Sequence, residues 1–254
     1  MKVARASLFF GLVPIRGWWA AAASVSLLRL VDMLDFQQNT RLWVAGFQLL
    51  HRFSEMPIGA DNYLRSHELL SLADSQLLVI DVQEKLVPHI AGCEVLLANC
   101  LKLVKAADVL DVPCLATEQY PRGLGRTVPE LLGELPQPIE KLRFSSAEVL
   151  LQAGAVSGER DQIVLAGIEA HVCVQQTALD LLACGFRVYV AADAVASRNT
   201  LDWKLALRRM ADGGVTITTT ESVMFEWCEV AGTDEFKQIS RLITGRGNSG
   251  EPSK

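Results

Sequence analysis

Three side chains in this sequence have the chemistry of a nucleophile, a base and a supporting cation. Cys173 lies where the apolar run "IVLAGI" gives way to the amphipathic stretch "HVCVQQTALDLLACGF". Asp81 closes the apolar run "LLVID", and Lys141 lies in "IEKLRFS". A thiolate can attack a carbonyl carbon, a carboxylate can accept the thiol proton, and an ammonium group favours both anions. These three residues form the candidate catalytic group.

Cys173 carries the sharpest signal of the three. Backbone amides at the start of a helix favour an anion, so a thiol there is expected to ionise more readily than usual. Each residue also has an ordinary interpretation. Cys173 could be an inert buried cysteine, as we expect for Cys184, while Asp81 could cap a helix and Lys141 could be solvated. Their joint occurrence at strand ends favours catalysis.

The surrounding sequence alternates buried strands with helices from Ser75 onward. Apolar, β-branched runs are separated by segments with helical spacing, which is typical of a sheet covered on both faces. The runs are "LLVIDV", "VPCLATE", "PIEKLRFS", "QIVLAGI", "FRVYVAAD" and "VTITTT". We expect an α/β fold, a doubly wound three-layer α/β/α domain with a mainly parallel six-stranded sheet. Ligands bind at the carboxyl ends of strands in such sheets, where the three candidates lie.

Composition narrows the classes of partner. The chain has 254 residues, half of them hydrophobic, and a net charge of -5, which argues against nucleic acid. Six cysteines without a CxxC pair favour a reducing compartment, so we expect a cytoplasmic protein with free thiols. The four histidines do not pair with cysteines at zinc-finger spacing, and we expect neither a metal nor another cofactor.

The first 74 residues differ from the rest. Residues 1–74 are predicted to be an N-terminal extension, residues 75–244 the α/β domain, and residues 245–254 a disordered tail. The extension has two interpretations: translation begins further on, near Met33 or Met56, or the segment is a targeting signal for an organelle or for export. Its apolar stretch is too short to span a membrane.

Four motifs in order resemble the isochorismatase-like cysteine hydrolase superfamily, which includes nicotinamidases and N-carbamoylsarcosine amidases. They are "LLVIDVQEKL", "TEQYPRGLGRTVPEL", "KLRFS" and "GIEAHVCVQQTALDLLACGFRVYVAADAVASR". The chain is similar to the isochorismatase-domain proteins that carry "TEQYP". The resemblance implies a triad of Asp81, Lys141 and Cys173, and a cis peptide between Ile168 and Glu169. It also implies an oxyanion hole made by the amides of Glu169 and Cys173, and a homo-oligomer.

The same resemblance bears on the substrate. Nicotinamidases place metal-binding histidines after the second strand, whereas "TEQYPRGLGRTVPEL" contains none. True isochorismatases cleave a vinyl ether and need no thiol. We therefore expect a small amide or related acyl compound. The candidate substrate-binding residues are Gln83, Glu118, Gln119, Tyr120 and His171, with Arg122 beside them. A plain turn around Pro121 and a structural His171 are the alternatives.

Two functions remain open at this point. The first is a cysteine hydrolase that cleaves a C–N amide bond through an acyl-enzyme. The second is a non-catalytic member of the fold that binds a small molecule or senses oxidants through its thiol. A sensor often keeps a resolving cysteine nearby, and Cys184, eleven residues on, is poorly placed for that. The presence of Asp81 and Lys141 favours the hydrolase.

Overall fold

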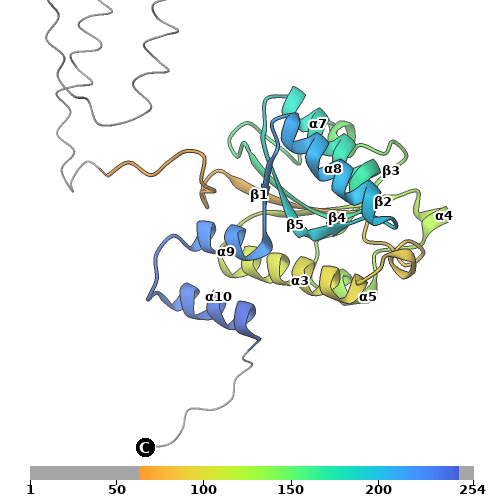
Figure 1. Ribbon diagram of the computed structural model, residues 1–254. Coiled ribbons are helices and arrows are strands. Elements are labelled where there is room, and N and C mark those ends of the chain that lie inside the picture. The colour runs from red at the N-terminus through yellow and green to blue at the C-terminus, as the bar shows by residue number, and fades with distance from the viewer. Residues whose placement is uncertain (1–62, 246–254) are drawn as a thin grey trace, which may run out of the picture. The chain divides into compact units, whose positions relative to one another are not determined.

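The computed structural model describes residues 63–245, which include a six-stranded parallel sheet (Figure 1). The strand order is β3-β2-β1-β4-β5-β6, and every neighbouring pair is parallel. The strands are β1 (Ser75–Ile80), β2 (Cys114–Gln119), β3 (Ile139–Lys141), β4 (Gln162–Ile168), β5 (Arg187–Ala196) and β6 (Thr216–Thr218). The predicted fold class is therefore confirmed. The predictions for residues 1–62 and 246–254 lie outside the described residues.

Helices cover both faces of the sheet and complete three layers (Figure 1). One face carries α3 (Cys93–Val109), α9 (Thr220–Cys228) and α10 (Asp234–Thr244), which contact one another. The other carries α6 (Ala147–Gln152), α7 (Gln175–Ala183) and α8 (Thr200–Asp212). Shorter turns are η2 (Val87–His89), α4 (Pro121–Leu124), α5 (Pro129–Leu132) and the π-helix η3 (Ala170–Val174). Within residues 63–245, no helix is both long and apolar enough to cross a membrane.

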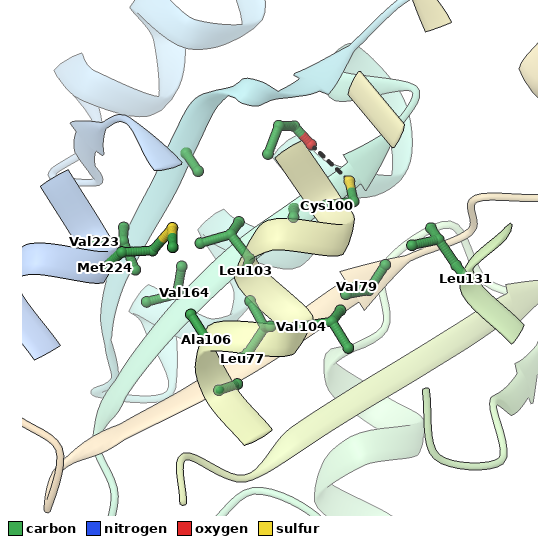
Figure 2. Close-up of a cluster of buried hydrophobic side chains, with 14 of the residues drawn as sticks. Leu77, Val79, Cys100, Leu103, Val104, Ala106, Leu131, Val164, Val223 and Met224 are labelled. Carbon is green, nitrogen blue, oxygen red and sulfur yellow. Dashed lines mark hydrogen bonds between the residues drawn. The ribbon is translucent and has the colours of Figure 1, made fainter. Parts of the chain in front are cut away.

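The two central strands, β1 and β4, are buried along their whole length, which explains their unbroken apolar sequences. Successive side chains of a strand point to opposite faces, so β1 supplies both cores. Leu77 and Val79 face the core under α3, while Leu78 and Ile80 face the core under α7. Figure 2 shows Leu77 and Val79 beside Leu103 and Val104 of α3. Burial on both faces holds the strand ends in fixed positions.

The order of the strands locates the edge where function is expected. The chain runs outward from β1 through β2 to β3, and then returns to the other side of β1 as β4. This reversal is the switch point at which doubly wound sheets bind ligands. Ile80 at the end of β1 pairs with Thr117 of β2 and with Gly167 of β4. The residues that follow Ile80, Thr117 and Gly167 therefore meet at the carboxyl edge of the sheet.

Candidate active site

Asp81 and Lys141 form a buried ion pair at this edge. Asp81 directly follows β1, and Lys141 is the last residue of β3. The Lys141 ammonium nitrogen lies 2.7 Å from Asp81 Oδ2, and neither side chain has any exposed surface. Two charges are costly to remove from water, and removing one partner of such a pair costs about 3–5 kcal/mol. A solvated lysine and a helix-capping aspartate are thus both excluded as descriptions of these residues.

Several acceptors fix the Lys141 ammonium besides Asp81. Its Nζ donates to Gln119 Oε1 at 2.7 Å and to the Phe144 carbonyl oxygen at 2.8 Å. The Arg143 carbonyl oxygen lies at 3.3 Å. Hydrogen bonds of this kind stabilise the charged form of a buried amine and aim it. Gln119, predicted to bind substrate, lies at the site through its contact with Lys141.

Cys173 lies in the π-helix that follows β4. Single π turns inside helices are frequent at functional sites. The thiol is buried, with 5% of the residue exposed. Burial raises the pKa of Cys173, and the charge of Asp81 raises it further, whereas the charge of Lys141 acts in the opposite direction. The paired ends of β1 and β4 bring Asp81 and Cys173 to the same edge of the sheet, where Lys141 pairs with Asp81.

The direction of that pKa shift corrects one prediction. The position of Cys173 near a helix start suggested a thiol that ionises readily. The pKa is raised instead, because loss of water and the charge of the nearby Asp81 carboxylate outweigh the charge of Lys141. The charge of Glu169 raises the pKa of the thiol further. The resting site therefore holds a neutral thiol beside an ion pair.

The turn between β4 and Cys173 corrects a second prediction. No cis peptide bond occurs among residues 63–245, so the predicted cis bond between Ile168 and Glu169 is wrong. The chain reverses by a different device, with Gly167 at φ 134° and Glu169 at φ 51°. Two positive φ values redirect the backbone without isomerising a peptide bond. Ile168 lies between them, fully buried in the core under α3.

Side chains from the end of β5 bind this turn. Arg198 Nε donates to Glu169 Oε1 at 2.6 Å, and His171 Nδ1 lies 3.2 Å from Glu169 Oε2. The same nitrogen lies 3.0 Å from the Ser197 hydroxyl. His171 thus contacts protein groups on the turn before Cys173. We did not predict Ser197 or Arg198, although "ASR" follows a predicted strand and so falls at the same edge.

Gln83 and Glu118 are buried and bonded to other protein groups, and their assignment to substrate binding stays a prediction. Gln83 is fully buried, and its amide donates to the carbonyls of Gln119 and Gly125 while its oxygen accepts from the Gln119 amide. Glu118 accepts from the backbone and hydroxyl of Thr127. Strand alternation explains this: Gln119 faces Lys141, so its neighbour Glu118 faces away.

Tyr120 remains at the rim of the site. It has φ 39°, begins α4 and is half exposed. Its ring lies against Gly123, where an added Cβ would come within 2.2 Å of a ring carbon. Arg122, in α4, is exposed. Of the predicted substrate-binding residues, Tyr120 has the most exposed side chain, and its backbone amide donates to the Lys141 carbonyl oxygen at 2.9 Å.

Thr117 belongs to the site and was missed in the sequence. Its hydroxyl donates to Asp81 Oδ1 at 2.8 Å, and the residue is buried. Thr117 lies two residues before Gln119, so both side chains leave β2 on the same face. This two-residue spacing was the feature of the sequence from which Thr117 could have been predicted. Among residues 63–245, no group of three or more histidine, cysteine, aspartate or glutamate side chains is arranged to hold a metal ion.

Comparison with known proteins identifies the family. The model of the isochorismatase domain matches residues 75–222, which contain all three candidate catalytic residues. The chain belongs to the isochorismatase family. A member from Danio rerio, isochorismatase domain-containing protein 2, is 41% identical over 175 residues, covering 68% of this chain and 89% of the relative.

Solved structures of other proteins share the fold. The structure described as the MAR1 ribonuclease of Caenorhabditis elegans has a TM-score of 0.65 and 34% identity, covering 73% of this chain and 98% of that one. The Escherichia coli YcaC protein, described as an octameric hydrolase of unknown specificity, has a TM-score of 0.62 and 23% identity, covering 72% and 98%. At that identity, the second likeness shows the fold alone.

Proposed function

We propose that this isochorismatase-family protein is a cysteine hydrolase that cleaves the C–N bond of a small amide. One observation carries the proposal: a neutral, buried thiol lies beside a buried Asp81–Lys141 ion pair at the switch point of the sheet. A carboxylate close to a thiol can take its proton when an electrophile arrives. The name of the C. elegans structural relative, a ribonuclease at 34% identity, describes a hydrolytic protein and supports the broader class.

Acylation uses the three proposed catalytic residues. Asp81 takes the Cys173 proton as the sulfur forms a bond to the amide carbon, and the carbonyl oxygen becomes an oxyanion. The resemblance to the family assigns that oxyanion to the amides of Glu169 and Cys173, a form of stabilisation that water cannot supply in advance. As the tetrahedral intermediate collapses, the C–N bond breaks and Asp81 returns the proton to the departing nitrogen. The products are an amine and a thioester on Cys173.

Deacylation reverses these roles with water. Asp81, again a carboxylate, takes a proton from a water molecule that attacks the thioester carbon. The C–S bond then breaks, the proton passes from Asp81 to the sulfur, and a carboxylic acid leaves. Lys141 keeps its proton throughout and offsets the negative charge that moves between sulfur and carboxylate. One amide and one water give one acid and one amine, so the cycle is balanced.

Burial of the nucleophile favours a small substrate. Only 5% of Cys173 is exposed, so a polymer backbone could reach the sulfur only after a large rearrangement. Tyr120 is the residue proposed to contact substrate at the rim. The segment "TEQYPRGLGRTVPEL" after β2 lacks the histidines by which nicotinamidases hold metal, so we favour simple primary amides and related acyl compounds over nicotinamide.

Two competing functions make different demands on the site. RNA cleavage, suggested by the name of the C. elegans relative, would need cationic surface for phosphates, whereas this chain has a net charge of -5. A redox sensor would need an accessible thiol of low pKa, whereas burial and Asp81 raise the pKa of Cys173. The observed site therefore favours hydrolysis of a small neutral substrate.

Self-association is part of the proposal. The E. coli YcaC protein, which shares the fold, is described as octameric. We propose that this protein also forms a homo-oligomer. Light scattering of the purified chain gives its mass directly, and a mass equal to the 27.8 kDa monomer would contradict this part.

The decisive experiment is a screen of small amides with matched cysteine variants. Wild type and Cys184→Ala should release acid and amine at equal rates, because Cys184 is exposed and lies outside the site. Cys173→Ala should lose about 10⁴-fold or more of the rate, as removal of a nucleophile does elsewhere. Mass spectrometry should detect an acyl adduct on Cys173. Equal rates in Cys173→Ala, or cleavage of RNA instead of amides, would overturn the proposal.

A further inference from the structure

Three buried hydroxyl groups lie behind Asp81, and the proposed mechanism uses none of them. They belong to Thr117 of β2, Ser146 before α6 and Thr177 of α7, and each residue is essentially without exposed surface. Thr117 Oγ1 lies 2.8 Å from Asp81 Oδ1 and 3.4 Å from Ser146 Oγ. The Ser146 amide in turn donates to Thr177 Oγ1 at 2.9 Å. A polar chain therefore runs from α7 to the candidate base.

The number of hydroxyl hydrogens fixes the direction in which these hydrogen bonds are donated. A threonine hydroxyl carries a single hydrogen and two acceptor lone pairs. Thr117 gives its hydrogen to Asp81, because an ionised carboxylate can only accept. The contact between Thr117 and Ser146 must then use the Ser146 hydrogen, with Thr117 accepting. The order of donation is Ser146 to Thr117 to Asp81.

The Ser146 hydroxyl supports this order of donation because it does not cap the helix that it precedes. Ser146 lies directly before the first residue of α6, but its backbone angles are helical (φ -86°, ψ -12°), unlike those of a capping residue. The Ser146 side chain makes no capping hydrogen bond with α6. Its hydroxyl lies instead within reach of Thr117.

The chain completes the anchoring of the Asp81 carboxylate. Lys141 holds Oδ2 at 2.7 Å, and Thr117 holds Oδ1 at 2.8 Å, so both oxygens have a fixed donor. Two donors on different oxygens prevent the carboxylate from rotating about its last side-chain bond. Thr177 lies four residues after Cys173 on the helix that follows it, so the chain also ties the nucleophile's helix to the base.

We infer that Thr117 is a positioning residue that, with Ser146 behind it, holds the Asp81 carboxylate in the orientation that receives the Cys173 proton. This inference rests on the proposed function, because it assigns Asp81 the role of base. Hydroxyl groups in an apolar core cost free energy unless paired, and here the pairing leads to the candidate base. Thr117 acts through Asp81 and does not touch the substrate.

The test compares acyl transfer from p-nitrophenyl acetate in four threonine variants. Thr117→Val keeps the shape and removes the hydroxyl, so the rate of nitrophenolate release should fall roughly tenfold to a hundredfold, the range of a hydrogen bond to a charged group. Thr117→Ser restores the hydroxyl and should recover most of the wild-type rate. Thr220→Val is the matched control, because Thr220 also donates to an aspartate, Asp193, but away from the site. Of the variants in the buried hydroxyl chain, Thr177→Val should lower the rate of nitrophenolate release least.

The outcomes separate this inference from the proposed function. A loss in Thr117→Val that Thr117→Ser does not recover indicates a packing effect and overturns the inference, as does a wild-type rate in Thr117→Val. Release that is equal in wild type and Cys173→Ala overturns the proposed function instead. The Thr117 hydroxyl proton is then followed by NMR: we expect slow exchange and a downfield shift that Asp81→Asn abolishes. A resonance unaffected by Asp81→Asn would contradict the inference independently of turnover.

Discussion

At the scale of single residues, the surroundings of Cys173 favour its protonated thiol. A buried thiolate beside Asp81 would place two negative charges together in a region of low dielectric, and the raised pKa of Cys173 expresses that cost. Lys141 carries a single positive charge, so it could offset only one of the negative charges on the Cys173 thiolate and Asp81. Transfer of the thiol proton to Asp81 leaves the number of charges unchanged. A neutral resting site can thus form a nucleophile without a net charge being buried.

Substitution of Asp81 should accelerate one reaction of Cys173 and abolish another. Asp81→Asn removes the charge that raises the thiol pKa, so the pKa should fall and iodoacetamide should alkylate Cys173 faster at neutral pH than in wild type. Amide hydrolysis should be lost, because no base remains. Adding Lys141→Met should slow alkylation again, since Lys141 lowers the thiol pKa. Peptide mass spectrometry over a pH series reports each rate.

Wild type supplies the reference for that experiment. At pH 6.5, the exposed Cys184 should be labelled before Cys173, because a raised pKa leaves almost no thiolate. Labelling of Cys173 should increase only as the pH rises above the range of an ordinary thiol. Slower alkylation in Asp81→Asn would show that the carboxylate promotes ionisation of the resting thiol and would contradict the charge argument.

At the scale of elements, β4 brings Cys173 to the site through a close approach to β1. Gly167 is the next-to-last residue of β4, and the register between β4 and β5 shifts beside it, between Leu165 and Gly167. A Cβ at Gly167 would lie 2.1 Å from the Ile80 carbonyl oxygen. A glycine is required there both by that distance and by the φ of 134°. The strand immediately before Asp81 and the turn before Cys173 are thereby held together.

Gly167→Ala tests this contact against a second glycine. Strain at positive φ and a clash with the β1 backbone should together lower the free energy of unfolding by about 2–4 kcal/mol. Gly185→Ala, also at positive φ but with no atom within 4 Å of the added Cβ, should cost only about 1 kcal/mol. Urea titration of both variants measures the difference. Equal losses would mean that the approach of β4 to β1 does not require glycine.

At the scale of the whole molecule, the segment before β1 is part of the folded domain. Leu70 is fully buried in the core under α3, and the Gln162 side chain contacts the backbone of Ser71 and Leu69. Arg160 donates to the carbonyls of Leu72 and Ser75. These contacts join residues 69–75 to the start of β4. Residues that we assigned to the extension thus cover the amino-terminal edge of the sheet.

A pair of adjacent leucines tests how much this segment contributes. Leu70→Ala should lower the free energy of unfolding by about 2–5 kcal/mol, because it leaves a cavity in a closed core. Leu69 is 39% exposed, so Leu69→Ala should cost less than about 1 kcal/mol. Thermal and denaturant unfolding of the full chain measure both. A stable Leu70→Ala would indicate that the domain does not depend on the segment before Ser75.

The strand pattern was predictable because burial on both faces of a parallel sheet leaves unbroken apolar runs in the sequence. Those runs also locate Asp81, Lys141 and Cys173 at one edge, since parallel strands end together. Thr117 could have been found from the same alternation that places Gln119. The contacts of Gln83 and Glu118 could not be predicted, because a strand end offers several polar side chains and only the folded chain shows which of them are bonded to the backbone or to Thr127.

The amino-acid sequence alone determined the fold class, the family and the residue types at the carboxyl edge, because periodicity and motif order are local properties. Only the tertiary structure decided the state of Cys173, the backbone route through Gly167 and Glu169, and the anchoring of Asp81 by Thr117. These depend on how far water is excluded and on which groups from distant strands meet. The position of the thiol at a helix start predicted a lowered pKa for Cys173. Its burial beside a carboxylate raises that pKa instead.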